Sequence, residues 1–115
     1  MKIFFKLSSY ALAILGIVHV LCTSISYSAI SCEAFWFAGT GLALLFLGVF
    51  NLTIIKSSNA SVYTGAIFAN GLCVLFSMLL LFVHPVWRSI AMLFVSLCVL
   101  LGSILRCSQL GEPAS

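Results

Sequence analysis

The distribution of charge is the feature that most constrains how this chain folds. Only 5 basic and 2 acidic residues occur among 115, and they separate four long apolar stretches. A soluble domain carries about 25% charged residues, whereas 6% of this chain is charged and 63% is hydrophobic. Because a soluble fold of this size leaves much of its surface exposed, it would not hide so much apolar area. The sequence therefore predicts that lipid surrounds most of the chain.

The apolar stretches are long enough to span a membrane, because one helical crossing needs about 20 residues. They must be helical, since unpaired backbone groups in lipid cost several kcal/mol. Pro85 is predicted to end the third helix and to start the fourth. We expect an all-α fold, a polytopic four-helix membrane bundle, in one domain. The predicted spans are about 3–22, 34–55, 62–83 and 86–105, followed by a disordered tail at 106–115.

Basic residues set the orientation, because cytoplasmic flanks are enriched in Lys and Arg. With both termini in the cytoplasm, Arg88 alone would lie on the outer side. Trp36 and Trp87 then fall at the outer boundary, where aromatic belts form. We therefore expect an N-in, C-in protein of the cell inner (plasma) membrane. The basic residues on the cytoplasmic side are Lys2, Lys6, Lys56 and Arg106.

The first span has an alternative interpretation as a cleaved signal peptide, since lysines precede an apolar stretch that ends near SYSA. The stretch is long for a signal-peptide core and contains His19. Bulky Leu21 before Cys22 does not fit a lipoprotein cleavage site. We expect the first span to be retained.

Polar and small residues fall on one face of each predicted helix. Lipid-facing positions should be apolar, so these faces are expected to meet in a packed bundle. Glycines let backbones approach closely. Helix contacts are therefore expected at Gly16, Gly39, Gly41, Gly48 and Gly65. The polar faces, span by span, are Gly16, His19 and Thr23; Glu33, Thr40, Gly48 and Asn51; Ala66, Asn70, Cys73, Ser77 and His84; and Ser89, Met92, Ser96, Ser103 and Cys107.

Ionisable residues within a membrane are costly and mark candidate functional sites. Glu33 has two interpretations: a charge that is favourable at a helix start, or one wall of an outward-facing polar pocket. Asn51 and Asn70 are expected either to join helices by hydrogen bonds or to line a polar path. The candidate pocket comprises His19, Glu33, His84, Arg88, Asn51 and Asn70.

Few residues are available for cofactor or redox chemistry. The ring of His19 is expected to hydrogen-bond to another span; the alternatives are a proton carrier or a haem or metal ligand together with His84. We expect no bound cofactor. Cys22 and Cys32 flank the outer loop and would be able to form a disulfide in an oxidising compartment.

No paired carboxylates and no hydrolase or phosphate-loop motif are present in the sequence, so we expect no enzymatic activity. The net charge of +3 forms no patch, which argues against nucleic acid as a partner. The expected role is an accessory or interaction subunit whose partners are the lipid bilayer and another membrane protein or further copies of the chain. The alternative is a small homo-oligomeric transporter or channel, with a path near His19, Glu33, Asn51 and Asn70.

Two segments, LGIVHV and EAFWFAGTGLALLFLGVFNLTI, resemble a group of small four-span bacterial inner-membrane proteins. The resemblance covers the first half of the chain. Because the group carries no assigned activity, the resemblance implies a topology but no function. The chain is similar in length to small multidrug resistance transporters, which carry a glutamate in their first span where this chain has His19. DoxX-like membrane proteins are a looser comparison. The resembling residues are Gly16, His19, Trp36, Phe37, Gly39, Gly41, Gly48 and Asn51.

Overall fold

A computed structural model describes residues 2–111, and its regular structure over that range is entirely helical. All four helices are long and apolar enough to cross a membrane. The chain is therefore a multi-pass integral membrane protein with an all-α fold, as predicted. The helices are α1 (Lys2–Ser26), α2 (Cys32–Ile54), α3 (Ala60–Val83) and α4 (Trp87–Gly111).

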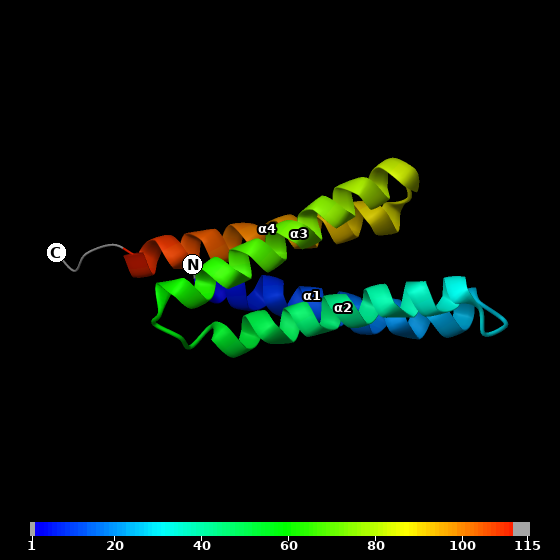
Figure 1. Cartoon of the computed structure of the whole chain (residues 1–115), viewed down its shortest axis with the longest axis horizontal. Coiled ribbons are helices and arrows are strands. Elements are labelled where there is room, and N and C mark those ends of the chain that lie inside the picture. The colour runs from blue at the N-terminus through cyan, green and yellow to red at the C-terminus, as the bar shows by residue number, and fades with distance from the viewer. Residues whose placement is uncertain (1, 112–115) are drawn as a thin grey trace.

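The bundle consists of two antiparallel hairpins, α1–α2 and α3–α4 (Figure 1). Helix α1 also packs along α4, whereas α2 and α3 meet over a small area. The first and last described residues and the α2–α3 connection lie at one end of the molecule, which we call the termini end. The two hairpin tips lie at the other end, which we call the tip end, and there the hairpins diverge (Figure 1).

Polar side chains define where the helices begin and end. Ser31 accepts a hydrogen bond at 3.1 Å from the backbone N–H three residues further on, which caps the start of α2. Asn59 caps α3 in a similar way, accepting from the N–H two residues further on at 3.0 Å. Helix α3 ends just before His84 and Pro85, and the hydroxyl of Ser89 donates to the carbonyl of His84 at 2.9 Å. Helix α3 therefore ends before Pro85, as predicted, whereas α4 begins at Trp87 and not at Pro85 itself.

The prediction of a disordered tail from residue 106 is wrong for residues 106–111, which continue α4. Packing explains the difference. Cys107 and Leu110 lie against the apolar core, and the Cys107 thiol lies 3.7 Å from the carbonyl oxygen of Ala60 at the start of α3. Residues 112–115 lie outside the described part of the chain.

Helices α1 and α2 approach closely at glycines, as the sequence predicted for three of them. A Cβ atom placed on Gly16 would lie 2.5 Å from the backbone nitrogen of Leu45 and 2.6 Å from the carbonyl oxygen of Gly41. A Cβ atom on Gly48 would lie 2.6 Å from the backbone nitrogen of Ala13. Only hydrogen fits at these positions.

The same prediction is wrong for Gly39 and Gly65. A Cβ atom at either position would meet nothing within 4 Å. Both glycines lie on outward faces of their helices, which other elements of the chain do not cover.

Candidate functional site

The two buried asparagines bond to each other. The Nδ2 group of Asn51 donates to Oδ1 of Asn70 at 2.9 Å, and the Nδ2 group of Asn70 donates back to Oδ1 of Asn51 at 3.2 Å. Their exposed fractions are 0% and 1%. The pair joins α2 to α3, which otherwise meet over a small area. The structure thus favours the interpretation of Asn51 and Asn70 as interhelical hydrogen-bond partners over that of a path wall.

A second buried polar cluster joins α3 to α4. The hydroxyl oxygens of Ser77 and Ser96 lie 3.2 Å apart, and Cys73 Sγ lies 3.3 Å from the Ser96 hydroxyl. Ser77 also donates to the Cys73 carbonyl at 2.8 Å, and Ser96 to the Met92 carbonyl at 2.7 Å. Each hydroxyl proton therefore has an acceptor without water. The polar faces predicted for these two spans do meet, and they meet as packing contacts.

Tyr63 is a buried polar residue that sequence reasoning missed. Its hydroxyl lies 3.0 Å from the carbonyl oxygen of Ile54 and 3.2 Å from that of Ile55, so its proton is shared between carbonyls at the end of α2. Its ring packs on Phe5, with centroids 5.9 Å apart. A tyrosine pairs an apolar ring with one polar atom that needs a partner when buried. A tyrosine in a predicted span, close in sequence to the end of the preceding helix, was therefore the sequence signal for this hydrogen bond.

The ring of His19 stacks on Phe37 of α2, with centroids 3.9 Å apart and planes 19° apart. The ring of Tyr27 also packs against Phe37, with centroids 5.6 Å apart and planes 58° apart. The interhelical hydrogen bond expected for the imidazole is not found among residues 2–111; the bond made at this residue is from the Thr23 hydroxyl to the His19 carbonyl, at 3.2 Å. An aromatic stack therefore orients His19.

The remaining candidate residues are exposed and lie at the tip end. Glu33 is in the first turn of α2, two residues after the capping Ser31, which agrees with a helix-start role. His84 and Arg88 belong to the tip of the other hairpin, and the two tips diverge (Figure 1). The six predicted residues thus fall into an asparagine pair, a stacked histidine and three exposed groups.

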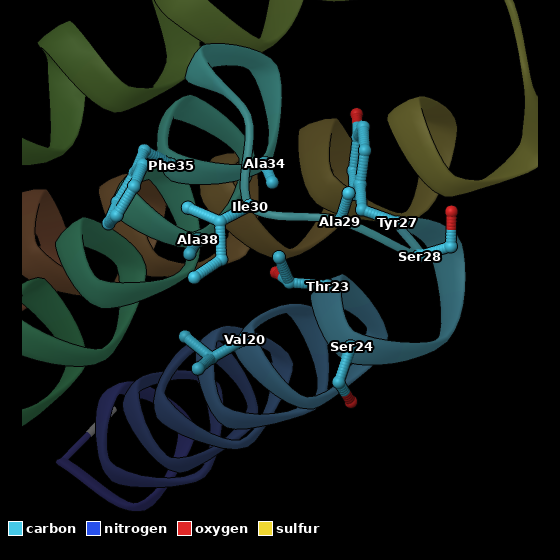
Figure 2. A pocket seen from close by; sticks show the side chains of 10 residues that line it. All are labelled: Val20, Thr23, Ser24, Tyr27, Ser28, Ala29, Ile30, Ala34, Phe35 and Ala38. Carbon is cyan, nitrogen blue, oxygen red and sulfur yellow. The ribbon is translucent and has the colours of Figure 1, made fainter.

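A surface cavity of about 420 Å³ opens at the tip of the α1–α2 hairpin (Figure 2). The end of α1, the connection and the start of α2 surround it, so one side is polar and the other apolar. It contains none of the six candidate residues. Its lining is Val20, Thr23, Ser24, Tyr27, Ser28, Ala29, Ile30, Ala34, Phe35 and Ala38.

The geometry gives limited support to the predicted disulfide and to the alternative of a metal site. Helix α1 extends beyond its predicted end, so Cys22 lies within it and is half-buried, while Cys32 is exposed at the start of α2. Both are free thiols, and their pairing stays a prediction for an oxidising compartment. Within residues 2–111, no group of three or more His, Cys, Asp or Glu side chains is placed to hold a metal ion. His19 and His84 belong to different hairpins.

Comparisons of the chain with protein-family models, curated proteins and solved structures find no match.

Proposed function

We propose that this protein is a non-catalytic accessory or interaction subunit of the inner membrane, which acts through lateral contact of its helices with another membrane protein. The observation that carries the proposal is the contrast between its interior and its outward faces. Inside, the buried asparagines, serines and Tyr63 are hydrogen-bonded to groups of the same bundle. Outside, a Cβ atom placed on Gly39, Gly65 or Gly71, which lie within α2 and α3, would meet no other part of the described chain within 4 Å.

Glycine is a poor choice on a helix that touches only lipid, because it costs about 1 kcal/mol relative to alanine in a helix interior. Its benefit in a membrane is close approach of a second helix. Gly16, Gly41 and Gly48 give that benefit within the bundle. Gly39 and Gly65 have the same chemistry on free faces, so a neighbouring protein would supply the second helix.

The outward face of α2 adds suitable contact groups around Gly39. Phe35, Trp36 and Phe46 are on that face and are exposed in the isolated chain. The small Gly39 leaves a shallow depression between these large aromatic side chains, into which a side chain of another helix can pack. Aromatic residues also contribute much of the binding free energy of many interfaces.

The test is co-purification from the native membrane in mild detergent, with complex size measured by size exclusion and mass detection. Gly39→Leu and Gly65→Leu should dissociate the complex while the chain keeps its helical content, because neither side chain meets another part of the bundle. Ala11→Leu is the matched control, since Ala11 is a small, exposed residue on α1. A chain that purifies alone, or a complex that both glycine variants leave intact, would contradict the proposal.

The transport alternative has weaker support. Asn51 and Asn70, two of its proposed path residues, satisfy one another in the core. His19 is half-buried and remains the residue to test. A proteoliposome flux that His19→Ala abolishes would favour transport over the accessory role.

A further inference from the structure

The tight contact between α1 and α2 gives way to a cavity near the tip end. The glycine contact closest to that end is at Gly41, where an added Cβ atom would lie 2.8 Å from Cγ2 of Val20. Val20 also lines the cavity of about 420 Å³ that extends from there to the connection between the two helices (Figure 2). We call this space the tip cavity. It begins where the close packing of the hairpin ends.

Small side chains leave the tip cavity open on the α2 side. Ala38 and Ala34 come one and two turns before Gly41 in α2, so they lie on the helix face that meets α1. The helices touch at Gly41, but at the two alanines the space between them is not filled, because both line the cavity. Membrane helices are held together by van der Waals contact across such a face. The unfilled space is therefore available to a ligand.

One hydroxyl group faces the otherwise apolar middle of the tip cavity. Figure 2 shows Thr23 directed toward the middle of the lining residues, whereas the hydroxyls of Ser24 and Ser28 point away from it. The Thr23 hydroxyl already donates its proton to the carbonyl of His19 at 3.2 Å, so its oxygen remains free to accept a hydrogen bond. The cavity thus offers one acceptor among aliphatic and aromatic groups, the composition typical of a small-molecule pocket.

The described residues that line the tip cavity include no charged side chain. A charged ligand would lose its hydration there without gaining a partner, which is costly. A phospholipid headgroup is disfavoured for the same reason, because its phosphate would meet no cation.

The depth of the tip cavity matches that of an amphipathic molecule. Thr23 and Tyr27 lie just beyond residue 22, the predicted end of the first span, so the cavity lies where hydrocarbon gives way to the polar boundary. Amphipathic rings prefer this depth in membrane proteins. The volume falls within the range of about 300–1,000 Å³ for ligand pockets. At about 30 Å³ for each water-sized group, it holds roughly a dozen such groups.

We propose that the tip cavity binds a small neutral amphiphile, a molecule of about a dozen non-hydrogen atoms with one hydroxyl group and an apolar body. The hydroxyl of the ligand donates to Thr23 Oγ1. The apolar body lies against Val20, Ile30 and Ala38. This site does not depend on the lateral contacts proposed for Gly39 and Gly65.

Binding is measured on the full-length chain in phosphatidylcholine nanodiscs by NMR of isotope-labelled alanine methyl groups. The probe is para-hexylphenol; hexylbenzene lacks its hydroxyl, and para-hexylbenzoate carries a negative charge. Para-hexylphenol should shift the methyl signals of Ala34 and Ala38 saturably and leave that of exposed Ala43 unchanged. Hexylbenzene should bind about fivefold more weakly, because it lacks one hydrogen bond, and para-hexylbenzoate should cause no saturable shift.

Two variants test the site itself. Ala38→Leu fills the tip cavity and should abolish the saturable shift at Ala34, whereas Ala43→Leu, the same substitution at an exposed position of α2, should leave it unchanged. Thr23→Val keeps the shape of the side chain but removes the acceptor oxygen. It should weaken para-hexylphenol binding about fivefold and leave hexylbenzene binding unchanged, whereas a general change in the fold would alter both. Thr23→Val also tests the site if Ala38→Leu fails to fold.

Three results contradict the proposal. Shifts that do not saturate, or that are equal at Ala34 and Ala43, would mean that the probe only partitions into the bilayer, and would overturn the site. Binding of para-hexylbenzoate as tight as that of para-hexylphenol overturns the neutral ligand class. An equal effect of Thr23→Val on both neutral probes overturns the hydrogen bond.

Discussion

Replacing Gly16 with alanine tests whether close contact between α1 and α2 holds the first hairpin together. The new Cβ atom would lie 2.5 Å from the backbone nitrogen of Leu45, whereas ordinary contact begins at 3.4 Å. The helices must therefore separate by about 1 Å, because backbone atoms of a helix do not move independently. Overpacking costs about 1–3 kcal/mol, and alanine recovers about 1 kcal/mol of helix propensity. With the cost at its upper end, we expect Gly16→Ala to lower the free energy of unfolding by about 2 kcal/mol.

Gly39→Ala is the matched control, because the same substitution there meets nothing within 4 Å. Only the propensity gain applies, so the free energy of unfolding should stay the same or rise by up to about 1 kcal/mol. Both variants are unfolded by SDS in mixed micelles and followed by circular dichroism. The packing argument is refuted if Gly16→Ala proves as stable as Gly39→Ala.

Three further predictions concern the asparagine pair, the Tyr63 hydroxyl and the two cysteines. In the same unfolding assay, Asn51→Ala should cost about 0.6–2 kcal/mol, and adding Asn70→Ala should cost less than the first change; fully additive effects would mean that the amides are not coupled. Tyr63→Phe keeps the ring but removes the hydroxyl proton from the end of α2, and should cost about 1 kcal/mol; an unchanged unfolding midpoint would disprove that bond. Exposed Cys32 should react with an impermeant maleimide faster than half-buried Cys22; oxidised protein in which neither reacts would indicate a disulfide.

The candidate site was only partly predictable from sequence. The periodicity of polar residues placed Asn51, Asn70, Ser77 and Ser96 on inward faces, and all four are buried. It could not assign their partners, because a helical face says where a side chain points but not which of three other helices it meets. His19 shows the limit: its neighbour is an aromatic ring on another helix, and no local pattern encodes that stack.

The sequence by itself determined the membrane-spanning class, the helical state and the approximate spans. These follow from the solvation cost of charged groups and unpaired backbone in lipid, which acts on each segment separately. Only the tertiary structure decided which glycines face a helix and which face outward, since Gly16 and Gly39 occupy equally apolar stretches yet differ in what surrounds them. It also continued α4 to Gly111 and left the Nε atom of Arg106 without a hydrogen-bond partner among residues 2–111. Such properties depend on contacts between residues distant in the chain, which the composition of a single segment does not specify.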